Sequence, residues 1–275
     1  MSSPETILAR RRTFRELHGS GCFAIPNPWD PGSAKYLQKL GFKALATTSS
    51  GAAWRHGKAD GQMTVEEVLV HLQEMVDATD LPVNADFEAG FAGDAAGVAR
   101  NVRHAIATGV AGLSIEDSTG NPDAPLRDLA TSVERLRAAR GAIDESGGDT
   151  LLVGRAENFF VGRPDLDDVV KRLRAYAAAG ADCVYAPGIE TREQITAVVT
   201  AVAPTPVNLL VWKPTELTMS EIAALGVRRV SVGGALARTA WGGFMRAAQG
   251  LANDGTFDGL RGAANGVELN RLFAV

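Results

Sequence analysis

The sequence predicts an α/β protein: a single (β/α)8 barrel, or TIM barrel, with a helical N-terminal lead and a C-terminal helical extension. Two observations support this fold class. Eight short runs rich in β-branched residues alternate with helical patterns along 275 residues, close to the length of about 250 residues that is typical of such barrels. Helical patterns also end in glycine just before a strand run, as in "AIATGVAGLSIED" and "YAAAGADCVYAP", and glycine suits the left-handed backbone at a helix C-terminus.

The eight predicted strands are apolar runs, which is typical of parallel strands buried on both faces. They are "CFAIPN" (22–27), "FKALATT" (42–48), "PVNADFE" (82–88), "AGLSIED" (111–117), "LLVGRAE" (151–157), "ADCVYAP" (181–187), "PVNLLVW" (206–212) and "RRVSVGG" (228–234). An open doubly wound sheet is the alternative fold. No G-x-G-x-x-G turn follows the first run, which makes that alternative less favoured.

Helix starts are marked by the pattern S/T-x-x-E/Q, in which two side chains satisfy free backbone N–H groups. It occurs at Thr64–Glu67, Thr131–Glu134, Thr191–Gln194 and Thr218–Glu221. No linker divides the chain, so we expect one domain over residues 1–275, with a helical tail over 240–275. An apolar stripe in this tail serves either internal packing or a subunit interface. Its members are Trp241, Phe244, Met245 and Leu251.

Composition excludes several classes of protein. The net charge of −4 provides no broad basic surface, which argues against nucleic-acid binding through phosphate neutralisation. Cys22 and Cys183 lie far apart, so neither a disulfide framework nor a thiolate zinc site is expected. No apolar run approaches 18 residues, and the N-terminus lacks the apolar region of a secretory signal. We therefore expect a cytoplasmic protein without a membrane span.

Acidic residues collect at the carboxyl ends of the predicted strands, where barrels carry their chemistry. Asp86 and Glu88 are two residues apart and so share a strand face. Two charges 4 Å apart at an effective dielectric of 20 repel by about 4 kcal/mol. Together with Asp60 and Glu116 they form an oxygen-only set that suits a hard ion, Mg²⁺ or alternatively Mn²⁺. The other interpretation is a group of solvated acids.

The remaining polar candidates leave alternatives open. Arg155 and Glu157 share a strand face, as a salt bridge or with Arg155 as a clamp for a substrate carboxylate. Hydroxyl groups follow the second strand, and Asn208 lies in the seventh. His56 lies in a loop and is a weaker candidate for substrate contact, whereas the other three histidines fall within helical patterns. The hydroxyl-bearing loop comprises Thr48, Ser49, Ser50 and Gly51.

Three segments, "ADFEAGF", "LSIEDS" and "GRAENF", occur in this order at fitting intervals, and the chain resembles the isocitrate lyase/phosphoenolpyruvate mutase superfamily. The resemblance implies a Mg²⁺-binding barrel that acts on a pyruvate-like α-oxo acid and forms a homo-tetramer, a dimer of dimers with exchanged C-terminal helices. It implies that Asp86 binds the metal directly, while Glu88, Asp60 and Glu116 hold it mostly through water.

The same resemblance assigns the substrate contacts. Arg155 would bind the substrate carboxylate, and the loop of Thr48 to Gly51 would cradle it, with Glu157 and Asn208 nearby. The residues expected to take part in catalysis are Arg155, Glu116 and Asp60.

The loop after the fourth strand departs from the family pattern. Isocitrate and methylisocitrate lyases carry K-K/R-C-G-H there, whereas this chain has "EDSTGNPDAPL", which argues against those two activities. Mutases carry a lysine and an asparagine in that loop, and here only Asn121 is present. The favoured hypothesis is a Mg²⁺-dependent lyase or hydrolase of an oxaloacetate-like or alkylmalate-like acid. The alternatives are C–P chemistry on a phosphonopyruvate-like substrate, with Arg55 and His56 as further phosphoryl contacts, and a non-catalytic metabolite-binding barrel.

Overall fold

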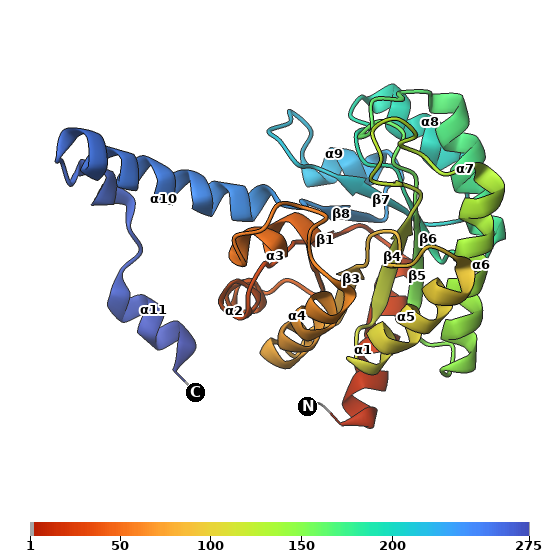
Figure 1. Cartoon of the computed structure of the whole chain (residues 1–275), viewed down its shortest axis with the longest axis horizontal. Coiled ribbons are helices and arrows are strands. Elements are labelled where there is room, and N and C mark those ends of the chain that lie inside the picture. The colour runs from red at the N-terminus through yellow and green to blue at the C-terminus, as the bar shows by residue number, and fades with distance from the viewer. Residues whose placement is uncertain (1–2, 275) are drawn as a thin grey trace.

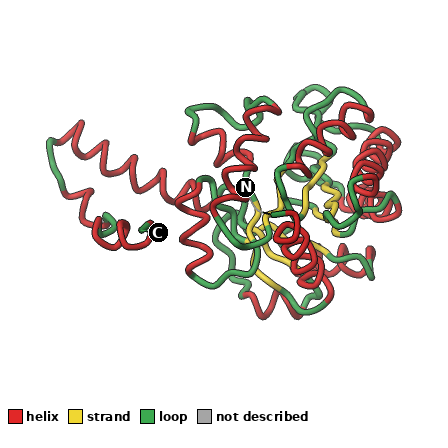
Figure 2. Tube along the Cα trace, turned by 90° about the horizontal axis from the view of Figure 1, so that it is seen from below, coloured by secondary structure: helices red, strands yellow, loops and turns green. Residues whose placement is uncertain are grey.

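Eight parallel strands form the centre of the computed structural model, which describes residues 3–274. Helices surround them (Figures 1 and 2). Neighbouring strands follow the order β1-β8-β7-β6-β5-β4-β3-β2, which confirms the predicted barrel and all eight predicted strand positions. The strands are β1 Phe23–Ile25, β2 Leu45–Ala46, β3 Val83–Asp86, β4 Gly112–Glu116, β5 Leu151–Arg155, β6 Cys183–Tyr185, β7 Val207–Leu210 and β8 Arg229–Ser231.

The seam between β1 and β2 is the least bonded part of the barrel. Within the described residues, these strands share one backbone hydrogen bond, from Ala46 N to Pro26 O at 3.1 Å. The side chain of Asn27 completes the closure. Its Nδ2 donates to Thr47 O, and its Oδ1 accepts from the backbone N–H groups of Val232 and Gly233, each at 2.9 Å. A single buried amide thus joins the ends of β2 and β8.

The helices occupy the predicted positions, but one of the four predicted N-cap residues is wrong. Thr64, Thr191 and Thr218 are N-caps with complete capping boxes, as predicted. Thr131 is not a cap, because Asp128 lies three residues earlier and its carboxylate accepts from Thr131 N. Aspartate is as strong an N-cap as threonine. The helices are α1 Pro4–Gly19, α2 Pro31–Lys39, α3 Ser49–Arg55, α4 Val65–Ala78, α5 Ala95–Ala107, α6 Leu129–Glu145, α7 Leu166–Ala178, α8 Arg192–Val202, α9 Met219–Ala224, α10 Ala235–Asp254, the 3-10 helix η1 Asp258–Gly262 and α11 Gly266–Phe273.

Helix α1 packs against the barrel through Phe14 and His18. Phe14 is fully buried in a small apolar cluster with Ile25, Ala46 and Leu151. His18 is also buried, and its Nδ1 lies 2.7 Å from the carbonyl oxygen of Phe14. The predicted helical lead is therefore part of the barrel core.

Helix α10 extends away from the barrel, and α11 lies back towards α2 (Figure 1). The ring of Phe273 on α11 contacts the position of Gly32 on α2. The apolar stripe on α10 is exposed in this single chain, with Phe244 at 61% and Leu251 at 52%. None of the described helices is long and apolar enough to cross a membrane.

Candidate active site

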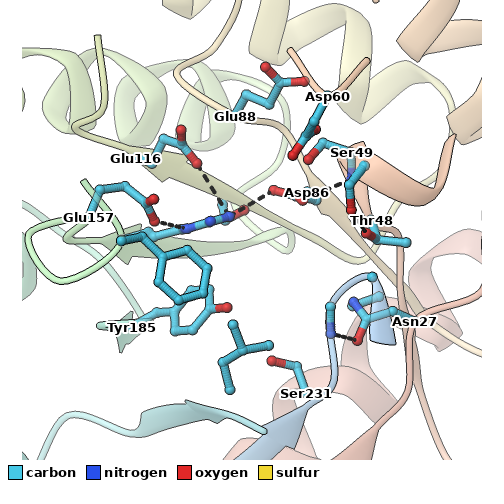
Figure 3. Close-up of a pocket in the computed structure, with 18 of the residues that line it drawn as sticks. Asn27, Thr48, Ser49, Asp60, Asp86, Glu88, Glu116, Glu157, Tyr185 and Ser231 are labelled. Atoms are coloured by element: carbon cyan, nitrogen blue, oxygen red, sulfur yellow. Dashed lines mark hydrogen bonds and ion pairs between the residues drawn. The ribbon is translucent and has the colours of Figure 1, made fainter. Parts of the chain in front are cut away.

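A cavity of about 630 Å³ opens at the carboxyl ends of the strands, and the predicted polar residues line it (Figure 3). Ten of the eleven predicted site residues contribute: Thr48, Ser49, Ser50, Asp60, Asp86, Glu88, Glu116, Arg155, Glu157 and Asn208. Gly51 is the exception and does not line the cavity. It is buried in α3, where an added Cβ would lie 2.7 Å from the Thr48 methyl group and 2.9 Å from Trp29. Gly51 therefore serves close packing.

Arg155 is the centre of the acid cluster. Its Nε pairs with Glu157 Oε1, and its Nη1 lies 3.2 Å from Asp86 Oδ1 and 3.3 Å from Glu116 Oε2. The guanidinium group is 14% exposed. The salt bridge to Glu157, one of the two alternatives, is present, and Arg155 also lines the cavity, while its role as a clamp for a substrate carboxylate stays a prediction.

Asp86 is held by groups from the neighbouring strand end. Its Oδ2 accepts from Ser49 N at 3.0 Å, and its backbone N–H donates to Thr47 Oγ1 at 2.9 Å. The N–H of Ser49, which the family resemblance assigns to the substrate, is therefore bonded to the acid in this arrangement. The hydroxyl groups of Thr48 and Ser50, 3.1 Å apart, contact each other at the wall of the cavity.

Glu88 reaches the cavity through a left-handed turn. Strand β3 ends at Asp86, and Glu88 has φ +44°, a backbone region that residues other than glycine seldom adopt. Partial burial, followed by the charges of Asp86 and Asp60, raises the pKa of Glu88 to about 7. Such strain is often found at functional sites. The two acids share the cavity because of this turn and not because of strand alternation alone.

Two further acids show the excess of negative charge. Burial raises the pKa of Glu116 well above its usual value, although Arg155 opposes the shift. Asp60 lies at the exposed rim, and loss of solvent on its cavity side, with the Asp86 charge, raises its pKa despite a hydrogen bond with Ser49.

The donor set fits a hard divalent ion. Five carboxylates line the cavity around Arg155, all of them oxygen donors, and burial together with repulsion between acids raises the pKa of Glu88 and of Glu116. A divalent cation would relieve that repulsion. Within residues 3–274, no three acid, histidine or cysteine side chains converge closely enough to hold an ion as they stand. Arg155 pairs with three of the acids instead.

Asp117, next to Glu116, points away from the cavity into a buried network. Its Oδ2 accepts from Tyr176 Oη at 2.5 Å and from Arg172 Nη1 at 3.0 Å. Its Oδ1 accepts from the backbone N–H of Glu157 at 2.8 Å. Asp117 therefore fixes the chain that carries Glu157.

His56 and Arg55 do not line the cavity. His56 is an exposed residue at the end of α3, and Arg55 pairs with Glu74 at 2.5 Å. Neither residue reaches the cavity in this arrangement, so their role as phosphoryl contacts stays a prediction. Of the histidines within helices, His18 and His71 are buried, whereas His104 is exposed on α5.

Several cavity residues were missed by the sequence analysis. Aromatic residues form part of the wall, and a polar group lies deep in the barrel. Tyr185 could have been found from its position at the carboxyl end of the sixth run, in register with Arg155. Arg229 gave no signal, because it begins the eighth strand. The missed residues include Asn27, Trp54, Phe160, Tyr185, Trp212, Arg229 and Ser231.

Comparison with known proteins identifies relatives along nearly the whole chain. Residues 14–252 match the family model described as phosphoenolpyruvate phosphomutase. An oxaloacetate decarboxylase from Bradyrhizobium sp. (strain BTAi1 / ATCC BAA-1182) is 33% identical over 235 residues, which cover 82% of this chain and 78% of that protein. A crystal structure of a lyase/mutase-type protein from Burkholderia cenocepacia J2315 is 46% identical, with a TM-score of 0.95 and 98% of each chain covered. The structure of 2,3-dimethylmalate lyase is 28% identical, with a TM-score of 0.84 and coverage of 99% of this chain and 95% of that one.

Proposed function

Because the chain belongs to the phosphoenolpyruvate mutase family, within the isocitrate lyase/phosphoenolpyruvate mutase superfamily, we propose that it is a metal-dependent lyase. Its substrate is a small α-oxo dicarboxylate such as oxaloacetate. Cleavage of the C–C bond leaves an enolate of pyruvate or a close relative. The observation that carries the proposal is the acid cluster around Arg155 at the mouth of an open cavity.

The residues present support this chemistry. Asp86 would bind Mg²⁺ or Mn²⁺ directly, with Glu88, Asp60 and Glu116 contributing mostly through water. When bound, the ion supplies a Lewis acid for the oxygen that gains charge as the bond breaks. Arg155 orients the substrate carboxylate and contributes a fixed positive charge. Thr48, Ser49 and Ser50 also line the cavity with hydroxyl groups, and Thr48 and Ser49 lie across it from Glu157 (Figure 3).

The cations favour a carboxylate substrate over a phosphonate. Within residues 3–274, the cavity is lined by Arg155, Arg229 and Arg238 and by no lysine. Arg155 already pairs with three acids, and Arg229 lies deep in the barrel. The loop after β4 contributes Ser118, Thr119 and Gly120, which carry no charge. C–P chemistry is therefore the second candidate, supported by the family model and by similarity to a structure named as a phosphonomutase.

Calorimetric titration of oxalate, with and without Mg²⁺, tests the proposal. Oxalate imitates the planar pyruvate enolate, and a site built for that intermediate binds such an analogue tightly. We expect Mg²⁺-dependent binding that is lost in Asp86→Ala and retained in Asp123→Ala, an exposed loop position. The unmodified protein should also consume oxaloacetate and release pyruvate when Mg²⁺ is present. Equal oxalate binding by both variants would contradict the metal role of Asp86, and absence of binding by the unmodified protein would favour a non-catalytic barrel.

Two features support a homo-oligomer in the cytoplasm. The exposed stripe on α10 supports pairing with a second copy of the chain, and a tetramer built as a dimer of dimers would follow from two such contacts. Cys22 and Cys183 are free thiols, which agrees with the reducing cytoplasm.

A further inference from the structure

Tyr185 presents a phenolic hydroxyl to the cavity from the end of β6. The residue is 8% exposed and lines the cavity near Ser231 (Figure 3). The guanidinium carbon of Arg155 lies 5.2 Å from the centre of the tyrosine ring. The chain has no lyase cysteine in the loop after β4, so the group that protonates an enolate product must come from elsewhere.

A buried cation lies two strands from Tyr185, at the same level of the sheet. Arg229 is 3% exposed, and all its hydrogen-bond partners are neutral acceptors. Its Nε donates to Asn208 Oδ1 at 2.8 Å, and its Nη1 lies 3.3 Å from Asn84 Oδ1 and 3.4 Å from His18 Nε2. Burial and nearby arginines lower the pKa of His18 to about 3, so its ring is neutral. No acid in the described residues forms an ion pair with Arg229, so its charge is uncompensated.

Arg229 fixes the direction of a hydrogen-bond chain. Because a guanidinium group only donates, it holds the oxygen of the Asn208 amide towards itself. The Nδ2 atom of Asn208 must then face Ser231, and it donates to Ser231 Oγ at 3.0 Å. The hydroxyl hydrogen of Ser231 is therefore free to point onward.

The next group is Tyr185, whose hydroxyl lines the same cavity as Ser231 (Figure 3). Within residues 3–274, no group accepts a hydrogen bond from the Tyr185 hydroxyl itself, so its hydrogen is available to a ligand in the cavity. Tyr176 shows the opposite arrangement, because its hydroxyl donates to buried Asp117 at 2.5 Å. Of these two tyrosines, Tyr185 is the one that lines the cavity and whose O–H is unused within residues 3–274.

We propose that Tyr185 is the proton donor that converts the enolate product to its keto form, and that Arg229, Asn208 and Ser231 are positioning residues that aim its O–H. This inference rests on the proposed function. With oxaloacetate, the C3–C4 bond breaks, CO₂ leaves, and the electron pair becomes the C2–C3 double bond of the enolate. The Tyr185 proton is transferred to C3 and forms the methyl group. The phenolate then takes a proton from water.

Burial raises the pKa of the Tyr185 hydroxyl, with Arg155 opposing the shift, so the phenolate is a short-lived species. Ser231 can offer its hydroxyl hydrogen to it, because Arg229 holds Asn208 and Asn208 donates to Ser231. The Arg155 guanidinium group over the ring and the buried Arg229 charge both favour the anion. This gives a reason for a buried arginine without an acid partner, which is otherwise costly.

The test compares Tyr185→Phe with Tyr36→Phe, which alters a half-exposed tyrosine on α2. Each Mg²⁺-loaded protein is mixed with oxaloacetate, and CO₂ release and keto-pyruvate formation are followed separately, with the metal-only background subtracted. A general acid typically contributes about 10²–10⁴-fold. We expect Tyr185→Phe to release CO₂ but to form keto-pyruvate on the protein at least about 100-fold more slowly, so that the product leaves as the enol. Tyr36→Phe should release the keto form like the unmodified protein.

Oxalate titration of the same proteins separates the two proposals. Unchanged oxalate affinity in Tyr185→Phe, together with enol release, supports the assignment. Keto-pyruvate released by Tyr185→Phe without a lag relative to CO₂ would overturn it while leaving the proposed function intact. If the unmodified protein neither binds oxalate nor consumes oxaloacetate, the proposed function fails, and this inference fails with it.

Ser231 provides the test of the positioning residues. Ser231→Ala removes the hydroxyl that receives the Asn208 bond and should increase the fraction of product released as enol, whereas Ser231→Thr keeps a hydroxyl there and should restore keto release. Equal enol fractions in both variants would show that the hydrogen-bond chain does not aim Tyr185.

Discussion

Arg155 on β5 and Asp86 on β3 form an ion pair across the barrel mouth, with Nη1 and Oδ1 3.2 Å apart. The pair joins the residue expected to hold the substrate to the residue expected to hold the metal ion. A divalent ion that takes over Asp86 would free part of the guanidinium group for a carboxylate ligand. Metal and substrate binding should therefore be positively coupled.

Replacement of Arg155 tests its role at the centre of the cluster. Arg155→Met should lower oxaloacetate turnover by about 10²–10³-fold, as loss of an oriented charge-stabilising group does. It should also lower the free energy of unfolding by about 3 kcal/mol, because buried Glu157 loses its partner. Turnover at saturating Mg²⁺ and chemical denaturation measure the two effects. Arg137→Met, at an exposed position of α6, should change neither, and normal turnover in Arg155→Met would contradict the role.

Glu88 combines strain with function. Glu88→Gly and Glu88→Gln both remove the charge, but only glycine relieves the left-handed backbone at φ +44°. The strain is worth about 1 kcal/mol. We expect the metal-free glycine variant to have the higher free energy of unfolding of the two, while both bind Mg²⁺ more weakly than the unmodified protein. Denaturation and metal titration check this, and equal stability of the two variants would argue against strain.

His71 makes the protein sensitive to acid. Both of its ring nitrogens are buried without a hydrogen-bond partner in the described residues, and burial lowers its pKa to about 4. The unfolded chain binds the proton near pH 6.5, so stability is present above pH 6.5 and falls as the pH decreases towards 4, by about 3 kcal/mol. His71→Leu should flatten this part of the stability curve, measured by urea denaturation between pH 4 and 7. His104→Leu, at an exposed position, should leave the slope unchanged.

The buried network of Asp117 should matter for stability. Asp117→Ala leaves Arg172 without this acid and removes the acceptor of Tyr176 and of the Glu157 backbone. Loss of one partner of a buried pair costs about 3–5 kcal/mol. Thermal or chemical denaturation should show this loss, and Asp123→Ala should show none.

The stripe on α10 predicts the assembly. Phe244 is 61% exposed in a single chain, and Phe244→Asp would place a charge in the proposed interface. We expect the mass measured by light scattering to fall from a multimer to smaller species. Arg246→Asp, at an exposed polar position of the same helix, should keep the multimer, and an unchanged mass for Phe244→Asp would exclude this surface as the contact.

The fold could be predicted because its signals are local. A glycine that ends a helix and a β-branched run after it identify each β-α unit without knowledge of the neighbours. The acids at the strand ends were predicted for the same reason, since strand position alone brings Asp86 and Glu116 to one mouth. The left-handed turn at Glu88 and the packing of Gly51 depend on contacts between elements. The group of His18, Asn208 and Arg229 joins positions about 200 residues apart, and no short pattern identifies such a set.

Because the barrel closes through the side chain of Asn27, one side of the barrel has fewer backbone hydrogen bonds between its strands than the other. Strands β4 and β5 pair through five residues, whereas β1 and β2 share one backbone bond and the Asn27 amide. Local opening costs least where few backbone bonds must break. The segment with Thr47 to Ser50 lies beside that seam, while Glu116, Arg155 and Tyr185 lie on the well-paired side. Solvent and ligands can thus be exchanged along one wall of the site while the opposite wall keeps the reacting groups in register.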